Sequence, residues 1–242
     1  MKGNRFPILA SGLAMALALT SVAAAKNNVK GPPPDIDPSN FVGEVNNPFF
    51  PLTPGTTFFY EGETDGIPTR DEVYVTYQTK QILGVRCTVV HDSVFENGVL
   101  AEDTFDWYAQ DTAGNVWYFG EDSRELDENG NVISTEGSWE AGVNGAQPGI
   151  IMEADPHVGD HYRQEFAAGV AEDMAQVLNL NRSACVRYGC FDDLLLTKEW
   201  SPLDPGVVEH KYYAEDVGFI LGMAVKGEDE RTELVRITTE SP

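Results

Sequence analysis

The residues of this chain that could do chemistry are its four histidines, its three cysteines and its many carboxylates. His157 and His161 are four positions apart and Glu165 follows four positions later, a spacing that on a helix would place three metal ligands on one face. Gly159 and the strand-like sequence after His161 argue against a helix, so we predict no metal site. The sequence also contains no Gly-x-Ser-x-Gly, HExxH or phosphate-loop pattern, and it indicates no cofactor.

General acid or base catalysis inside a cavity of the protein is left open by the sequence. If the chain is an enzyme, its candidate catalytic residues are Glu140, Glu165, Lys198 and His210. Paired carboxylates do not help to choose among them, because a chain with 39 acidic and 16 basic side chains contains many such pairs by composition alone.

The cysteines predict one disulfide bond and one free thiol. Cys185 and Cys190 bracket a short predicted turn, and paired positions across a hairpin can meet disulfide geometry. Cys87 lies in apolar strand-like sequence and is predicted to be a small buried side chain rather than a nucleophile.

The N-terminus predicts export. Residues 1–25 combine Lys2 and Arg5 with an apolar run and a group of alanines, which is typical of a cleaved secretory signal peptide. A permanent anchor is disfavoured because the run is shorter than the roughly 20 residues that span a bilayer. Residues 26–46 are proline-rich and predict an extended tether, and residues 47–242 predict one β domain in a secreted or periplasmic protein.

The charge of the chain excludes some partners. Loss of Lys2 and Arg5 with the signal peptide would reduce the 16 basic side chains to 14 and move the formal charge from −23 to −25. A field of this sign repels nucleic acid and anionic lipid, so neither is expected as a partner. The oligomeric state cannot be predicted from these features.

The elements that must position any site are predicted to be antiparallel strands around an aromatic hairpin at residues 103–121. The alternation of residues 71–79 predicts a half-buried strand, with Val73, Val75 and Tyr77 on one side, and residues 82–94 predict a more buried strand. Residues 48–52 are apolar and are predicted to close one end of the core. Residues 170–180 fit a helix or a strand, and their neighbours favour a strand. The fold class is therefore all-β and mainly antiparallel, as a single curved sheet or a barrel-like meander with a glycine-rich loop near residues 137–149.

The aromatic side chains of the hairpin predict a cavity. Alternation places Phe105 and Trp107 on one face, and the hairpin returns Trp117 beside them. The glycine-rich loop carries Trp139, either as a lid over this cavity or as a plug in the end of the core. The predicted ligand-binding residues are Trp107, Trp117, Tyr118, Trp139, Glu140, Gln147 and Tyr212.

Several long motifs resemble a family of exported bacterial β-rich proteins without an assigned activity. These are GTTFFYEG, FDWYAQDTAGNVWYFGE, GSWEAGVNGAQPGIIM and EHKYYAEDVGFI, and the likeness covers about residues 47–225. The last motif also resembles the closing hairpin of lipoprotein-carrier-like proteins, whose curved antiparallel sheets bind acyl chains. This second resemblance implies a lipid as one candidate ligand.

Three functions are consistent with these features. The first is a binding module that holds an apolar or aromatic small molecule or a lipid in an aromatic-lined cavity. The second is an enzyme that uses acid or base groups in that cavity, and the third is a cell-envelope module that binds other proteins. Binding is favoured, because aromatic residues are plentiful and no reactive constellation can be named.

Overall fold

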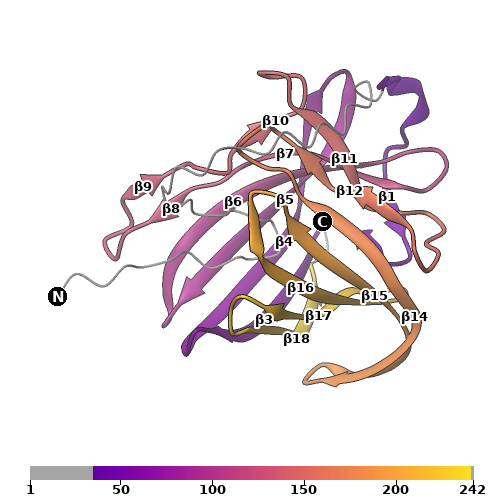
Figure 1. Cartoon of the computed structure of the whole chain (residues 1–242). Helices are drawn as coiled ribbons and strands as arrows, with labels where there is room; N and C mark the ends of the chain where they lie inside the picture. Colours follow the sequence, from indigo (N-terminus) through magenta and orange to yellow (C-terminus); the bar gives the residue numbers. More distant parts are fainter. Residues whose placement is uncertain (1–34, 241–242) are drawn as a thin grey trace.

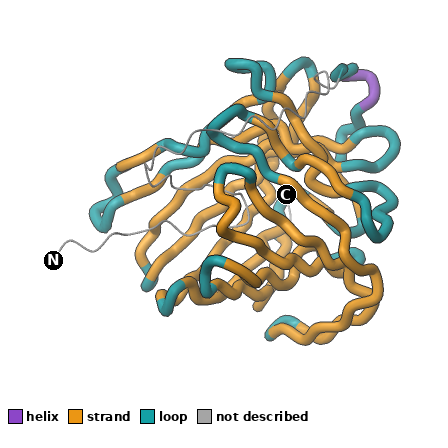
Figure 2. The backbone as a smooth tube through the Cα atoms, viewed as in Figure 1, coloured by secondary structure: helices purple, strands orange, loops and turns teal. Residues whose placement is uncertain are grey.

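The computed structural model describes residues 35–240, and these residues form strands joined by short turns (Figures 1 and 2). The strands are β1 (Val45–Asn47), β2 (Phe50–Leu52), β3 (Thr56–Thr64), β4 (Ile67–Ile82), β5 (Val85–Glu96), β6 (Val99–Gln110), β7 (Val116–Asp122), β8 (Glu125–Leu126), β9 (Val132–Ser134), β10 (Trp139–Glu140), β11 (Gln147–Met152), β12 (His161–Arg163), β13 (Glu165–Phe166), β14 (Met174–Val186), β15 (Gly189–Ser201), β16 (Asp204–Ala214), β17 (Gly218–Lys226) and β18 (Glu230–Thr239). A single 3-10 turn, η1 (Pro38–Asn40), is the only helical element of this part of the chain.

The strands build one 16-stranded antiparallel sheet, beside which β1 and β2 form a separate pair. The main path runs β12-β14-β15-β16-β17-β18-β3-β4-β5-β6-β7-β11-β13. Its two ends, β12 and β13, are consecutive in sequence and separated by Gln164, but no ladder joins them. The sheet therefore curves around a common interior without closing into a barrel (Figure 1), which confirms the predicted fold class.

Strand boundaries differ from the expectation at one turn. The predicted strand over residues 82–94 is wrong at its start, because Leu83 and Gly84 form the turn that ends β4 and begins β5. Both residues have positive φ, 51° and 81°, as two-residue hairpin turns require. Residues 174–180 belong to β14, which confirms the predicted strand for that part, whereas residues 170–173 precede it and form no strand.

The side chains of β4 also depart from simple alternation. The pairing register with β5 shifts between Val75 and Thr79, and this irregularity changes which side chains face inward. Val75 and Thr76 are both buried, whereas Tyr77 is 50% exposed, although alternation predicted that it shares the face of Val75. A bulge reverses the phase of a strand, because side chains alternate with a period of two residues.

The β1–β2 hairpin covers one end of the interior, as predicted for residues 48–52. Leu52 is buried, and the ring of Phe50 lies edge-on to Tyr108 with centroids 5.2 Å apart. Asn47 fixes the hairpin, because its Nδ2 donates to the carbonyl oxygens of Gly114 and Glu153, each at 3.0 Å. We call this hairpin, Val45 to Leu52, the cap.

The N-terminal segment packs on the outer face of β7. Phe41 pairs with Asp111 in an isolated bridge, and its ring lies edge-on to Trp117 and Phe119 at 6.2 and 5.6 Å. These contacts belong to the last part of the predicted tether. The signal peptide and the proline run before Asp35 lie outside the described residues. Within residues 35–240, no helix is long and apolar enough to cross a bilayer.

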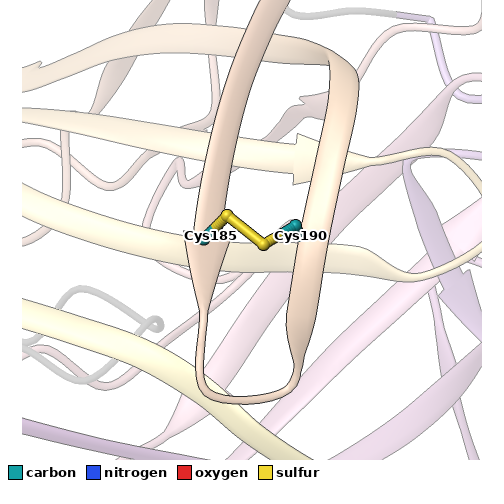
Figure 3. The surroundings of a disulfide bond; sticks show 2 residues. All are labelled: Cys185 and Cys190. Atoms are coloured by element: carbon teal, nitrogen blue, oxygen red, sulfur yellow. A yellow bond between two sulfur atoms is a disulfide. The ribbon is translucent and has the colours of Figure 1, made fainter.

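The disulfide bond joins Cys185 and Cys190 across the end of the β14–β15 hairpin (Figure 3). The two cysteines are register partners, with Cα atoms 4.0 Å apart. Cys87 is free and buried. The predicted assignment of all three cysteines is therefore confirmed.

Candidate functional site

A pocket of about 70 Å³ lies in the interior directly beneath the cap. It is lined by Phe50, Pro51, Leu52, Phe58, Tyr60, Val73, Val90, Asp92, Asp106, Tyr108, Ile151, Glu199, Lys211, Tyr213, Val217, Gly218 and Phe219. These residues come from the cap and from strands on both halves of the curved sheet. The pocket therefore forms only because the curvature of the sheet brings the two halves together.

One side of the pocket is apolar. The Phe219 ring lies 5.2 Å from that of Tyr60 and 5.8 Å from that of Tyr213, and Phe50 closes the space from the cap. Gly218 is needed where β17 meets the cap, because its φ is 94° and a Cβ there would lie 3.3 Å from Cδ of Pro51. The glycine at position 218 thus allows β17 to pack closely against the cap.

The pocket lining also contains a buried ion pair. The Lys211 ammonium lies 3.0 Å from a Glu199 oxygen and 3.6 Å from a Glu209 oxygen. Thr197 and Tyr213 donate hydrogen bonds to Glu199 at 2.8 and 3.0 Å. Burial alone would raise the pKa of Glu199, but Lys211 and these hydroxyls lower it below its usual value.

Asp106 is a further carboxylic side chain of the pocket lining. The Tyr118 hydroxyl donates to it at 2.6 Å and lies 3.1 Å from Glu121. Burial raises the pKa of Asp106 to about 6, and hydrogen bonds from Tyr118 and Tyr108 limit the rise. The carboxyl group therefore titrates near neutral pH, which is the range in which a general acid or base works.

Asp92 is the least satisfied polar group of the lining. Its side chain is 3% exposed, and its Oδ1 has no hydrogen-bond partner within the described structure. Burial raises the pKa of Asp92 well above its usual value, and the nearby carboxyls of Asp71 and Asp106 raise it further. A buried carboxyl oxygen without a hydrogen-bond partner is uncommon in native proteins.

The pocket belongs to an interior that is unusually rich in acids. Its buried carboxylic side chains are Asp71, Asp92, Glu102, Asp106, Glu121, Glu165, Asp173, Glu199, Glu209 and Glu230. Lys211 is the only buried cationic side chain among residues 35–240. Most of these acids have a raised pKa, because burial disfavours the charged form of a carboxyl group.

The residues first considered as metal ligands are dispersed. His157 lies on an exposed turn, 3.7 Å from Asp160, and the exposed ring of His161 stacks on Trp200. Glu165 is buried in the interior. In the part of the chain that the structure describes, no group of three or more histidine, cysteine or acidic side chains is arranged to hold a metal ion.

The predicted ligand-binding residues fall into separate places. Trp107 lies on the face opposite Asp106, where Lys80 sits 3.1 Å from its ring centroid and also pairs with Glu140 at 2.7 Å. The indole nitrogen of Trp117 donates to Asp111 at 2.9 Å. These three candidates, Trp107, Trp117 and Glu140, therefore have partners outside the pocket.

A second group of candidates does meet in the interior. The Trp139 ring lies edge-on to Tyr118 at 5.4 Å, and its indole nitrogen donates to Glu165 at 2.8 Å. Trp139 is 6% exposed and is carried by β10, which pairs with β7. The structure thus brings Tyr118, Trp139 and Glu165 together, next to the pocket and not in its lining.

The remaining candidates lie along the sheet. Lys198 and His210 are register partners on β15 and β16, and the Lys198 ammonium lies 4.6 Å from the Trp200 ring. Burial, Arg182 and Lys198 lower the pKa of His210. Gln147 pairs with Phe166 and Tyr212 with Leu196 in their ladders. No member of the predicted site set lines the pocket, and the ligand-binding role given to these residues stays a prediction.

Sequence reasoning missed the residues that do line the polar side of the pocket: Asp92, Asp106, Tyr108, Glu199, Lys211 and Tyr213. The sequence of β6 contains a pattern that could have indicated a polar pocket wall, because Glu102, Asp106 and Gln110 share a face with Tyr108. Such a set is ordinarily the solvent face of a strand, so alternation alone points it outward.

Comparison with known proteins finds distant structural likeness and no sequence family. No family model matches the chain, and no curated protein is similar to it. A candidate exported protein with a YmcC-like fold from Bacteroides fragilis shares 14% identity over 79% of this chain and 99% of its own, with a TM-score of 0.46. A candidate lipoprotein from Parabacteroides distasonis shares 12% identity over 78% of this chain and 98% of its own, with a TM-score of 0.44.

Proposed function

We propose that this chain is an exported protein that binds a small molecule with an apolar or aromatic body in the pocket beneath the cap. The observation that carries the proposal is the pocket itself. It combines an apolar wall with a few buried polar groups, which is the usual composition of a small-molecule site.

The sequence and the disulfide support export. Residues 1–25 have the pattern of a secretory signal peptide. The bond between Cys185 and Cys190 is of a kind that persists in oxidising compartments outside the cytoplasm. The formal charge of −23 makes nucleic acid an unsuitable partner.

The size of the pocket favours a small ligand over a long acyl chain. A cavity needs roughly 10–15 Å³ to hold one water molecule, so a pocket of about 70 Å³ offers space for one ring or a short alkyl chain. A lipid would require the cap to move away from the sheet. The bonds from Asn47 to Gly114 and Glu153 hold the cap in place and oppose that movement.

The proposal is tested by titrating the purified protein with benzene, indole and n-butanol, followed by ligand-observed NMR. Val90→Phe introduces a ring into the pocket lining and should abolish binding of all three compounds. The matched control is Val99→Phe, because Val99 is 45% exposed at the start of β6. Binding that survives Val90→Phe, or no binding to the wild type, would contradict the proposal.

An enzyme is the second candidate, and Asp106 is the observation that favours it. Its carboxyl lines the pocket and burial raises its pKa to about 6. Native mass spectrometry of wild type and Asp106→Asn, each purified from the native host, would separate the two functions. The same bound molecule in both proteins indicates a binding protein, whereas a chemically altered form in the wild type alone indicates an enzyme.

A further inference from the structure

We propose that the ligand of this pocket carries an ammonium group, which is held at Asp92 while the apolar part of the ligand lies under the cap. This inference rests on the proposed function, because it names the chemical class that the same pocket selects.

The first argument is the unpaired oxygen of Asp92. The side chain is 97% buried, it lines the pocket, and its Oδ1 has no partner among residues 35–240. Buried polar atoms without partners destabilise a fold, and native proteins normally avoid them. A ligand with an N–H donor at this end of the pocket would supply the missing hydrogen bond.

The second argument is the balance of charge in the lining. Asp92, Asp106 and Glu199 face the pocket, and Lys211 is the one cationic side chain of the lining. Lys211 is already occupied by Glu199 at 3.0 Å and by Glu209 at 3.6 Å. A carboxylate ligand would therefore find no free cation and would lie close to acidic groups, whereas an ammonium group would find carboxyl oxygens that can accept its hydrogen bonds.

The third argument is the aromatic character of the walls. Tyr60, Tyr108 and Tyr213 line the same pocket. Aromatic rings attract cations through their π-systems, most strongly when the cation has lost its water. The formal charge of −23 also raises the local concentration of cations around the molecule.

Binding of an ammonium ligand should be linked to the protonation of Asp92. Burial and the facing carboxyls raise the pKa of Asp92, which favours the protonated form of the group. The groups around it are Asp71 on β4, Asp106 and Glu102 on β6, and Tyr60 on β3, with Lys211 and Glu199 in the same lining. An ammonium ligand favours the ionised form of Asp92, so its binding should release a proton and strengthen as pH rises.

Isothermal titration calorimetry with three probes of equal chain length tests the inference. These are n-butylammonium, n-butanol and butyrate, each titrated at pH 7 in two buffers of different ionisation enthalpy. We expect n-butylammonium to bind roughly tenfold or more tightly than n-butanol, because charge-assisted hydrogen bonds are the stronger ones. Butyrate should show no binding. The difference between buffers should correspond to a net release of protons when the ammonium binds.

Asp92→Asn is the matching variant, since an amide resembles the neutral carboxyl of the empty pocket and should leave the fold intact. It should remove the preference for n-butylammonium over n-butanol and the release of the proton. Asp193→Asn is the control, because Asp193 is exposed and its φ of 52° suits asparagine. The proton release of the wild type is a readout that needs no variant, so the inference remains testable if Asp92→Asn fails to fold.

The outcomes separate this inference from the proposed function. If n-butanol binds and Val90→Phe abolishes it, but n-butylammonium binds no better, the pocket is a binding site and the ammonium inference is wrong. Tighter binding of butyrate, or an equal effect of ammonium chloride alone, would also overturn it. If no probe binds to the wild type, both the inference and the proposed function fail.

Discussion

Lys211 and Glu199 form an ion pair inside the protein, with Nζ 3.0 Å from Oε2 and side chains that are 10% and 4% exposed. Glu209 is the second acid beside this ammonium, at 3.6 Å. The adjacent strands β15 and β16 carry the three groups, so the ladder between these strands sets their distances. Lys211, the only buried cationic side chain among residues 35–240, is thus shared by two buried acids.

Removing this ammonium should be costly. Lys211→Met leaves Glu199 and Glu209 buried beside one another without a cation. Loss of one partner from a buried pair typically costs about 3–5 kcal/mol, and we expect a decrease in the free energy of unfolding of this size. Urea denaturation at pH 7 measures it.

Two further variants control for the side chain itself. Lys198→Met removes a lysine from the partly exposed position over Trp200 and should change stability by less than about 1 kcal/mol. Lys211→Met combined with Glu199→Gln should recover part of the loss, because one uncompensated charge is removed. Equal effects of Lys211→Met and Lys198→Met would show that the interior pair contributes little.

Stability should fall as pH rises from about 5 to 8. Burial raises the pKa of Asp71 to about 7 and those of Glu102 and Glu230 to about 8. Each value lies above the unfolded pKa near 4, so the folded state binds more protons in this range and the free energy of unfolding decreases with pH. We expect a decrease of more than about 1.4 kcal/mol, the value of one pKa unit for one group. Thermal unfolding at several pH values tests this.

A neutral substitution identifies the groups responsible. Glu102→Gln cannot ionise and should flatten the pH dependence, whereas Glu63→Gln on the exposed part of β3 should leave it unchanged. Below about pH 4 the slope should reverse, because Glu199 has a lowered pKa and its stabilising charge is lost as it protonates. A midpoint that rises steadily from pH 5 to 8 would contradict this account.

Much of the sheet was predictable, because strand identity is a local property. Alternation, the Asn97-Gly98 turn and the aromatic hairpin ending at β7 are each encoded within a few residues. The wrong boundary at Leu83 has a local cause as well. Leucine is not a residue type that favours positive φ, so the predicted strand included Leu83. Gly84 was the only sequence signal of the turn.

The pocket was not predictable in the same way, since it depends on which face of the sheet becomes the interior. Asp106 alternates with the apolar residues Phe105 and Trp107, and a polar face ordinarily meets solvent. Here β16, more than a hundred positions later in sequence, brings Lys211 against that face. The curvature of the sheet and the pairing of strands that are distant in sequence determine this arrangement. Neither can be predicted from the sequence of a single strand.

Cysteine chemistry provides a third prediction. The bond between Cys185 and Cys190 spans a sequence separation of 5, so loop closure allows it about 2 kcal/mol of stabilisation at most. Cys87 should not react with a thiol reagent in the native protein, because burial raises its pKa to about 12. Urea denaturation with and without reduction of the disulfide measures the first expectation, and peptide mapping after labelling, with and without urea, measures the second. Labelling of Cys87 without urea would contradict its burial.

The burial of Trp139 predicts that this side chain is a plug in the core and not a lid over the pocket. The indole is 6% exposed, packs against Tyr118 and donates to Glu165 at 2.8 Å. Trp139→Ala would open a cavity and leave that carboxyl oxygen without its donor. Truncation of a buried aromatic residue typically costs about 3–5 kcal/mol, and we expect a loss of this size in urea denaturation.

The same variant should leave the pocket functional, since Trp139 is not part of its lining. Benzene binding, measured at a temperature where Trp139→Ala is still folded, should remain within about threefold of the wild type. Trp117→Ala is the matched comparison, because Trp117 is only partly buried and its donor nitrogen meets Asp111 near the surface. Its loss should cost less stability, since a partly exposed side chain leaves a smaller cavity. If Trp139→Ala instead lowers stability by less than about 1 kcal/mol and abolishes benzene binding, Trp139 acts as a lid, and the plug interpretation is wrong.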